Sequence, residues 1–425
     1  MKLVARKSRL NGTVQIPGSK SHTIRAVAIG SLAKGTSFIR NPLSASDTLS
    51  AVDCYSALGA KIDKSDSNCW NIDGVAGKIK PTGKIIDVVN SGTTLRLAIG
   101  SAALAQMGVT TAFTGDEQIQ ARPIAPLINS LNDLGAHCVS VNNNGKAPLR
   151  ITGQIRGGRT TIEAVTSQYI SSLLLCTPLA KKDTTIEVSL LNEPGYVQMT
   201  LDWLDKQNIE YENTQFSRFT VKGNQTYSPF DLPIPADFSS ATFFLCAGAL
   251  FADEIKLNGL DFSDSQPDKA VVDYLKIMGA DINVSSEGVI VRASHLRGAD
   301  IDMNATPDAL PAMAVTAAFA NGVTRLLNVP QARNKETDRI ACMAQELKKM
   351  QVDVEELSDG LIIHPSQPLP AKLDGRSDHR LVMALSLAGL ALDGQCEIDT
   401  AEAMSVTFPD FVDMMKSIGA NMEVE

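Results

Sequence analysis

The sequence has few aromatic residues and no apolar run long enough to span a membrane. Aromatic residues make up 5% of the 425 residues, and polar residues interrupt every long apolar segment. These features argue against a membrane-spanning protein. The segment Lys2–Ala5 already has the pattern of a strand, so we expect no signal or transit peptide. We therefore expect a cytoplasmic protein.

Cysteine motifs and nucleotide-binding loops are also missing. The seven cysteines are scattered, without a Cys-x-x-Cys pair or a Cys/His cluster. This distribution is typical of buried, reduced thiols and predicts no metal site. Neither a Walker loop nor a Gly-x-Gly-x-x-Gly motif is present. We expect no metal ion and no organic cofactor.

The chain is acidic overall, with a formal net charge of −8. Nucleic-acid binding requires an open basic face, so we expect no nucleic-acid partner. Cations nevertheless collect at or near predicted helix starts, where unpaired N–H groups and the helix dipole attract anions. We therefore predict a buried site for small anions. These cations are Lys20, Arg25, Arg96, Arg122, Lys335, Arg339 and Arg380.

A unit of roughly 70 residues recurs six times along the chain. Each unit begins with cap-forming residues, continues into an apolar helix and a second helix, and ends in a β pair. The helix starts are Ser21–Thr23, Ser91–Thr94, Thr166–Gln168, Asp237–Ser240, Thr306–Asp308 and Ser377–His379. The helix stops are Leu58–Ala60, Leu134–Ala136, Gln207–Ile209, Met278–Ala280, Met350–Val352 and Ile418–Ala420. All stops except Met350–Val352 contain the Gly or Asn that a left-handed cap favours.

The two helices of each unit differ in their apolar pattern. The first helix is apolar nearly all round, as in Phe243–Leu250 and Leu381–Leu390, and belongs inside a domain. The second helix is amphipathic, as in Ile124–Leu134 and Lys335–Lys349, and should cover the outside. If the units pack in the same sense, the helix N-termini of each group gather at one end. Two such groups facing each other would enclose an anion-attracting cleft.

Seven motifs, in order along the whole chain, resemble the 5-enolpyruvylshikimate-3-phosphate synthase family. The resemblance implies an α/β fold, a two-domain inside-out α/β barrel built from six βαβαββ-type units. It implies one domain of residues 1–19 plus 237–425 and another of residues 20–236, with the active site in the interdomain cleft. The motifs are Pro17-Gly18-Ser19-Lys20-Ser21, Asn90-Ser91-Gly92-Thr93, Arg122-Pro123-Ile124, Thr166-Ser167-Gln168, Lys335-Glu336-Thr337-Asp338-Arg339, Asp378-His379-Arg380 and Thr407-Phe408-Pro409-Asp410.

The resemblance implies a transferase of the shikimate pathway, which leads to chorismate and the aromatic amino acids. Such an enzyme moves the enolpyruvyl group of phosphoenolpyruvate onto the 5-hydroxyl of shikimate 3-phosphate and releases phosphate. Addition followed by elimination needs a proton donor, a base, and cations that hold the carboxylates and phosphates. We expect a monomer whose domains close on these two small anions.

The resemblance also implies a role for individual residues. Asp308 resembles the base on the acceptor hydroxyl, Glu336 the proton donor to the methylene carbon, and Lys20 a third catalytic group that reaches toward phosphoenolpyruvate. The residues implied for shikimate 3-phosphate are Lys20, Ser21, Arg25, Thr166, Ser167, Gln168, Tyr196, Asp308, Gln331 and Lys335. Those implied for phosphoenolpyruvate are Lys20, Asn90, Gly92, Arg122, Gln168, Arg339, His379 and Arg380.

Purely structural roles remain open for several of these residues. Lys335, Glu336 and Arg339 have the spacing of a solvated salt-bridge ladder along one helix. Turn or cap roles are open for Asn90, Thr93, Asp308 and His379.

Three positions depart from the family pattern. Val406 stands where the family usually has a Lys before Thr407, so one cation near phosphoenolpyruvate is missing. Thr166 replaces a Ser and keeps the hydroxyl. The segment 192–196 has one more residue before Tyr196 and places Glu193 where a phosphate should approach. We expect the Glu193 side chain to point away from that phosphate, unless the acceptor differs.

These departures leave two alternatives open. One is an enolpyruvyl transferase with a different anionic alcohol acceptor. The relative that uses UDP-N-acetylglucosamine normally has a Cys before its Arg-Pro pair, and residues 114–121 contain none. The other is an inactive anion-binding relative, although a retired site has no need to keep buried charges such as Asp308, Glu336 and Lys20.

Overall fold

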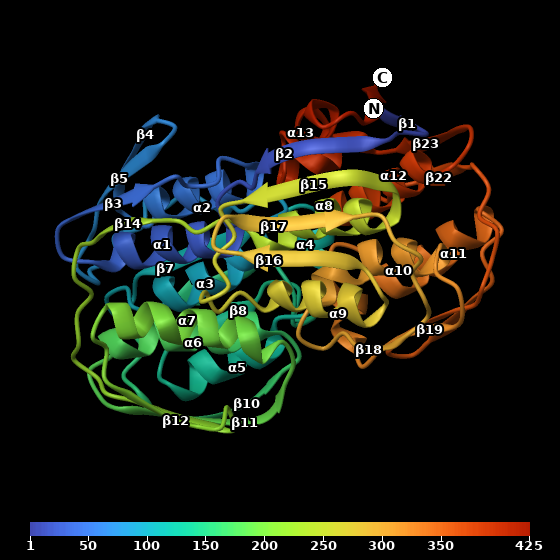
Figure 1. Cartoon of the computed structure of the whole chain (residues 1–425). Coiled ribbons are helices and arrows are strands. Elements are labelled where there is room, and N and C mark those ends of the chain that lie inside the picture. The colour runs from blue at the N-terminus through green and yellow to red at the C-terminus, as the bar shows by residue number, and fades with distance from the viewer. The chain divides into compact units, whose positions relative to one another are not determined.

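The computed structural model describes residues 1–425, which form two compact units (Figure 1). Unit 1 consists of Met1–Pro17 together with Pro235–Glu425, and unit 2 is Gly18–Ile234. Each unit contains one cluster of buried apolar side chains. None of the helices combines the length and the apolar character needed to cross a bilayer.

Each unit contains three four-stranded sheets, and all six sheets share one topology. An outer strand pairs in parallel with its neighbour, and the remaining strand pairs are antiparallel. The sheets of unit 1 have the orders β22-β23-β1-β24, β16-β17-β15-β2 and β18-β19-β21-β20. Those of unit 2 have the orders β14-β3-β5-β4, β6-β7-β9-β8 and β10-β11-β13-β12. The repeat predicted from the sequence therefore extends to the strand pairing.

The strand bounds follow the predicted spacing of β pairs. In unit 1 they are β1 Lys2–Arg6, β2 Leu10–Gln15, β15 Ala252–Asn258, β16 Asp281–Ser285, β17 Gly288–Arg292, β18 Asp300–Asp302, β19 Thr324–Leu327, β20 Val354–Leu357, β21 Gly360–Ile363, β22 Lys372–Asp374, β23 Gln395–Asp399 and β24 Asn421–Val424. In unit 2 they are β3 Thr36–Arg40, β4 Lys61–Asp66, β5 Cys69–Asp73, β6 Ile86–Asp87, β7 Thr110–Thr114, β8 His137–Ser140, β9 Leu149–Thr152, β10 Gly158–Ala164, β11 Thr184–Leu191, β12 Tyr211–Thr214, β13 Arg218–Val221 and β14 Asp231–Pro233.

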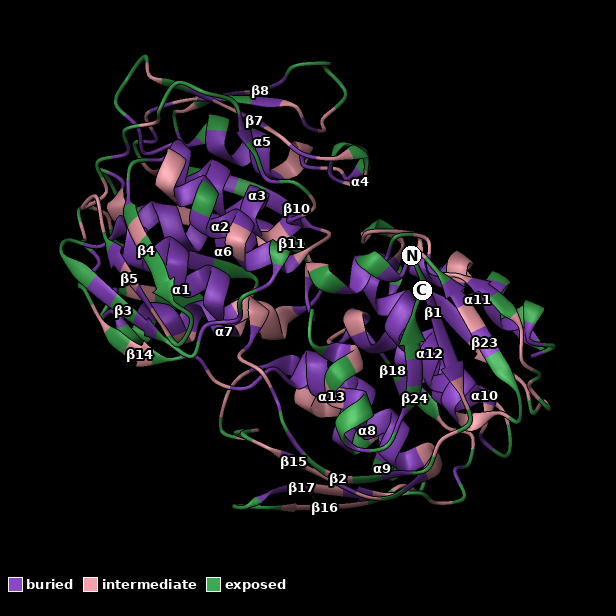
Figure 2. Ribbon diagram, turned by 90° about the horizontal axis from the view of Figure 1, so that it is seen from above, coloured by how far each residue is buried: buried purple, intermediate pink, exposed green.

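The first helix of each repeat is almost completely buried, as its all-round apolar pattern predicts. In unit 2 these helices are α1 Lys20–Leu32, α3 Gly92–Ala102 and α6 Ser167–Cys176, and α3 packs against the other two. In unit 1 they are α8 Phe238–Phe251, α10 Leu310–Ala318 and α12 His379–Ala391, which pack against one another. Figure 2 shows these helices mainly in the colour of buried residues. The arrangement confirms the predicted inside-out α/β fold.

The second helices of the repeats are less completely buried. They are α2 Ser46–Ala57, α5 Ala125–Asp133, α7 Pro194–Lys206, α9 Val271–Ile277, α11 Arg339–Lys349 and α13 Phe411–Ser417. The predicted helix start at Lys335 is wrong. The chain is extended at Lys335, and α11 begins at Arg339 because Asp338 caps it, its side chain accepting a hydrogen bond from the N–H of Ala341.

All six helix stops contain a residue in the left-handed region. The φ angles are 114° at Gly59, 105° at Gly135, 54° at Asn208, 93° at Gly279, 64° at Gln351 and 102° at Gly419. The fifth stop, which lacks Gly and Asn, therefore adopts the same backbone as the others. A residue with a Cβ is destabilised in this conformation, because the Cβ lies too close to the following carbonyl oxygen.

Replacing Gln351 by Gly should stabilise the protein by about 0.5–1 kcal/mol, because Gly removes the clash of the Cβ with the backbone. Gln351 is exposed, so the substitution removes no buried contact. The measurement is the urea midpoint of unfolding, followed by circular dichroism. Gln351→Ala is the matched control, because it shortens the side chain but keeps the Cβ. A midpoint that rises equally in both variants would contradict the explanation.

Candidate active site

Three cations of unit 1 converge on the carboxylate of Asp308. This residue lies in the short helix η3, Pro307–Ala309, just before α10. Its Oδ1 is 2.8 Å from Nη1 of Arg339 and 3.7 Å from Nζ of Lys335, and its Oδ2 is 3.0 Å from Nη2 of Arg380. The starts of α10, α11 and α12 thus meet at one carboxylate, so Asp308 does more than complete a helical turn.

Arg339 connects the members of this cluster. Its side chain is 1% exposed and contacts three carboxylates. Besides Asp308, these are Asp378, whose Oδ2 is 2.8 Å from Nε, and Glu336, which accepts a hydrogen bond from Nη2. Burial lowers the pKa of Arg339, but the opposing charges of Asp378, Glu336 and Asp308 outweigh it and raise this pKa above its ordinary value. The guanidinium is therefore a permanent positive charge.

The predicted alternative of a solvated salt-bridge ladder is wrong. Lys335 precedes the helix, and the side chains of Lys335 and Glu336 are only 15% and 11% exposed. Three cations, Lys335, Arg339 and Arg380, stand against three carboxylates, Asp308, Glu336 and Asp378. The stability of such a cluster depends on each of its members, because removing one side chain leaves the charge of its neighbour without a partner.

Asp378 and His379 form the start of α12. Asp378 is the N-cap, and its Oδ1 accepts a hydrogen bond of 2.9 Å from the N–H of Arg380. Its Oδ2 also accepts one of 3.1 Å from the hydroxyl of Thr337. His379 is the first residue of the helix and is 1% exposed. The cap therefore joins the N-terminus of α12 to the guanidinium of Arg339.

In unit 2, the N-terminus of α1 holds two cations in different ways. Lys20 forms an ion pair of 3.1 Å with Asp47 at the start of α2. Arg25 is buried and donates to neutral oxygens, among them the hydroxyl of Thr200 at 2.9 Å and the carbonyls of Tyr196 at 2.9 Å and Ser21 at 3.0 Å. Burial lowers the pKa of Arg25 to about 10. A buried guanidinium bonded to neutral groups favours an anion nearby.

Two further guanidiniums meet over Gly92 at the start of α3. A Cβ at this position would lie 2.5 Å from Nη1 of Arg122 and 2.6 Å from Nη1 of Arg96. Arg96 also donates to the carbonyl of Gly92 at 3.1 Å. Nearby, the amide of Asn90 donates to Asp116 and Gln118, both at 2.6 Å. A side chain at this position would displace the guanidinium ends of both arginines.

The N-terminus of α6 carries Thr166, Ser167 and Gln168. Gln168 donates to the hydroxyl of Thr93 at 3.1 Å, which joins the starts of α3 and α6. The side chain of Glu193, expected to point away from the phosphate unless the acceptor differs, lies against this helix start. Its carboxylate accepts a hydrogen bond of 2.8 Å from the hydroxyl of Ser167. The backbone at Glu193 is left-handed, with φ of 59°, and this turn directs the side chain back toward α6.

The remaining predicted residues lie in both units. Tyr196 is in the first turn of α7 in unit 2, where its carbonyl accepts from Arg25. Gln331 is in helix η4, Pro330–Asn334, of unit 1, is 2% exposed, and donates to the carbonyl of Asn304 at 2.8 Å. Val406 is half-buried at the end of helix η5, Ala401–Val406. Two residues later, the ring of Phe408 packs against Phe244 and Phe411.

Asp47 and Asp378 were missing from the predicted site, and Arg96 was predicted as a helix-start cation without a substrate. The sequence indicates Arg96, because it is a cation near a predicted helix start. The sequence also indicates Asp378, since it is the cap residue of a quoted motif. No sequence pattern indicates Asp47, because only folding of the chain brings it to Lys20.

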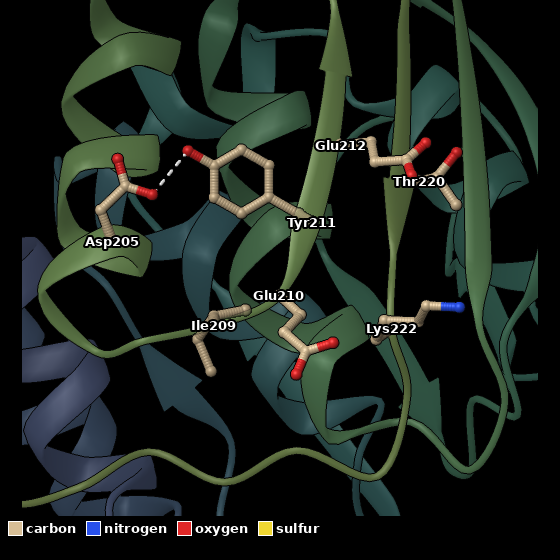
Figure 3. Close-up of a pocket in the computed structure, with 7 residues that line it drawn as sticks. All are labelled: Asp205, Ile209, Glu210, Tyr211, Glu212, Thr220 and Lys222. Atoms are coloured by element: carbon tan, nitrogen blue, oxygen red, sulfur yellow. Dashed lines mark hydrogen bonds between the residues drawn. The ribbon is translucent and has the colours of Figure 1, made fainter.

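A surface pocket of about 500 Å³ lies elsewhere in unit 2 (Figure 3). It lies beside the end of α7 and the β12–β13 pair, and the hydroxyl of Tyr211 donates to Asp205 across it at 2.8 Å. None of the predicted site residues lines this pocket. Its lining residues are Asp205, Ile209, Glu210, Tyr211, Glu212, Thr220 and Lys222.

Comparison with known proteins shows the family of the chain. The sequence model of the EPSP synthase family, 3-phosphoshikimate 1-carboxyvinyltransferase, matches residues 4–415. The chain belongs to the EPSP synthase family. It is 51% identical over 422 residues to the 3-phosphoshikimate 1-carboxyvinyltransferase of Acetivibrio thermocellus, covering 99% of each chain. It is 49% identical over 424 residues to that of Ruminiclostridium cellulolyticum, covering 100% of each.

Solved structures of EPSP synthase and of a related transferase have the same fold. The chain superimposes on an EPSP synthase from Acinetobacter baumannii with a TM-score of 0.84 at 25% identity, covering 100% of both chains. The enolpyruvyl transferase NikO from Streptomyces tendae gives a TM-score of 0.79 at 18% identity, covering 99% of this chain and 98% of that one. The second likeness concerns the fold alone.

Replacing Asp378 by Ala should lower the free energy of unfolding by about 3–5 kcal/mol, because it leaves Arg339 buried with one carboxylate fewer. The measurement is urea unfolding followed by circular dichroism. Asp237→Ala is the matched control, since Asp237 caps α8 in the same unit and its side chain accepts from Ser240. That variant should lose only about 1 kcal/mol, the contribution of a cap. Equal losses in both variants would show that the ion pair adds nothing.

Proposed function

We propose that this chain transfers the enolpyruvyl group of phosphoenolpyruvate to the 5-hydroxyl of shikimate 3-phosphate and releases phosphate. Membership of the EPSP synthase family supports this reaction, as do relatives named 3-phosphoshikimate 1-carboxyvinyltransferase at about half identity. The observation that carries the proposal is the carboxylate of Asp308 between the guanidiniums of Arg339 and Arg380. A fixed carboxylate beside permanent cations is what a reaction between two anionic substrates needs.

Asp308 is the proposed base for the acceptor hydroxyl. Arg339 and Arg380 hold its two oxygens at 2.8 and 3.0 Å and favour the ionised form, which can accept a proton. The acceptor oxygen then bonds to C2 of phosphoenolpyruvate while C3 receives a proton. Elimination removes one proton from the new methyl group and breaks the bond between C2 and the phosphate oxygen, which forms the enol ether. The phosphate leaves with the proton that Asp308 took from the hydroxyl, so the base is restored.

Glu336 is the proposed donor of the proton to C3. Its carboxylate is bonded to Arg339, and this cation favours the charged form. A substrate carboxylate or phosphate that binds Arg339 neutralises that cation and makes protonation of Glu336 easier. Glu336 therefore gains its proton only as phosphoenolpyruvate binds.

The cations of both units serve the same two substrates in this proposal. Arginine suits planar carboxylates and phosphates because it donates two parallel hydrogen bonds. The residues proposed for shikimate 3-phosphate are Lys20, Ser21, Arg25, Thr166, Ser167, Gln168, Tyr196, Asp308, Gln331 and Lys335. Those proposed for phosphoenolpyruvate are Lys20, Asn90, Gly92, Arg122, Gln168, Arg339, His379 and Arg380.

We further propose that the enzyme is a cytoplasmic monomer without a nucleic-acid partner. The net charge of −8 supports the absence of a nucleic-acid partner. Four of the site cations are paired with carboxylates in the clusters described above, so these four form no open basic face. They are Lys20, Lys335, Arg339 and Arg380.

Phosphate release from phosphoenolpyruvate tests the proposed reaction. We expect release in the presence of shikimate 3-phosphate and none without it. Asp308→Asn should lower kcat at least 100-fold, because general acid–base groups contribute about 10²–10⁴-fold. Asp300→Asn is the control, since Asp300 is an exposed aspartate of unit 1 on β18. A folded protein that releases no phosphate with this acceptor would contradict the proposal and favour a different acceptor or an inactive relative.

Replacing Gly92 by Ala should raise the KM for phosphoenolpyruvate about 10-fold, equal to about 1.4 kcal/mol of binding. The new Cβ displaces the guanidiniums of Arg122 and Arg96, which are the mobile ends of long side chains, so the fold should persist. Steady-state kinetics and a melting curve measure both effects. Gly30→Ala is the control. Gly30 lies in α1, and a Cβ there would meet Ile72 and Ser37 only at an ordinary contact distance of 3.4 Å. An unchanged KM in Gly92→Ala would rule out the guanidinium pair as the binding group.

A further inference from the structure

Glu193 is a buried acid held beside the N-terminus of α6. It is 1% exposed and immediately precedes α7. The preceding Asn192 fixes the segment, because its N–H donates to the carbonyl of Ala164 at 3.1 Å and its side chain to that of Val165 at 3.3 Å. Ala164 and Val165 lead directly into Thr166, the cap of α6. The side chain of Glu193 is therefore fixed at this helix start.

The Glu193 carboxylate accepts hydrogen bonds from three donors at this helix start. Its Oε2 accepts from the hydroxyl of Ser167 at 2.8 Å, from the N–H of Ser167 at 3.4 Å and from the hydroxyl of Thr166 at 3.4 Å. Helix N–H groups and hydroxyls of this kind bind phosphate. A serine hydroxyl has one proton to donate, so a Ser167 that donates to Glu193 cannot also donate to a phosphate oxygen.

We infer that Glu193 is an internal competitor of the acceptor's phosphate and limits the affinity of the protein for shikimate 3-phosphate. The inference rests on the proposed function, in which Thr166 and Ser167 bind that phosphate. Binding then requires the phosphate to displace the carboxylate from its donors. A carboxylate left nearby would also repel the phosphate, because both are anions. Loss of the Glu193 charge therefore tightens binding of the phosphorylated acceptor.

The same reasoning predicts a selective effect. Shikimate lacks the phosphate and does not displace Glu193, so its binding is independent of the carboxylate. Neither Thr166 nor Ser167 is a proposed contact of phosphoenolpyruvate, so the KM for phosphoenolpyruvate is independent of Glu193 as well. A change confined to the phosphorylated acceptor thus separates competition at α6 from a general loss of structure, which would weaken every ligand.

The test is calorimetric titration of Glu193→Gln and wild type with shikimate 3-phosphate and with shikimate. We expect Kd for shikimate 3-phosphate to fall at least fivefold in the variant, and Kd for shikimate to stay within twofold. The KM for shikimate 3-phosphate should fall in parallel, with kcat and the KM for phosphoenolpyruvate within twofold. Glu163→Gln is the charge-matched control, since Glu163 is an exposed acid on β10, and should change nothing.

Glu193→Gly provides a second variant that should fold well. It removes the carboxylate and places glycine at a left-handed φ of 59°. It should show the same gain as Glu193→Gln. In a Ser167→Ala background the gain should shrink to less than twofold, because the contested hydroxyl is gone.

The outcomes distinguish this inference from the proposed function. An unchanged or weaker affinity of both Glu193 variants for shikimate 3-phosphate would overturn the inference, even in a fully active enzyme. Tighter binding by both variants would support it, even if the wild type released no phosphate and the proposed reaction failed. Tighter binding of shikimate to the same extent would also overturn it, since the effect would not depend on the phosphate.

Discussion

The ion pairs of Arg339 are the interaction on which the charged cluster of unit 1 depends. One fully buried guanidinium contacts Asp308, Glu336 and Asp378. Because Asp378 also caps α12 and Asp308 precedes α10, this side chain fixes three helix starts together. Its positive charge survives burial only because the carboxylates surround it. The same contacts that stabilise the fold therefore hold the proposed catalytic acid and base.

Unit 2 uses its cations differently. Lys20 has a carboxylate partner in Asp47, whereas Arg25 is bonded to neutral oxygens and two guanidiniums meet over Gly92. At α6 the situation is reversed, because an acid, Glu193, holds the helix start. The proposed acceptor site thus contains both a cation that favours an anion and an anion that competes with one. In the inference above, this balance sets how tightly a phosphorylated substrate binds.

Repetition of one unit explains why both clusters exist. Each repeat buries an apolar helix, and five of the six helices begin with a side-chain cap. The exception is α10, which follows the short helix η3. Packing three such helices inside one unit brings their starts close together, as the contacts of Gln168 with Thr93 and of Arg380 with Asp308 demonstrate. Even the stop at Gln351 keeps the left-handed backbone without a glycine. The packing of the repeat decides this geometry, since the local sequence disfavours it.

The sequence by itself determined the six-fold repeat and the cations at the helix starts, and its resemblance to a known family predicted the inside-out α/β fold. Apolar periodicity and helix caps involve only a few neighbouring residues, so they can be recognised in the sequence without a structure. Only the tertiary structure decided that Lys335 precedes α11, that Asp47 pairs with Lys20 and that Glu193 turns toward Ser167. The start of α11 follows from the cap at Asp338. The other two outcomes depend on contacts between segments distant in the chain and on one left-handed turn, and no local pattern encodes them.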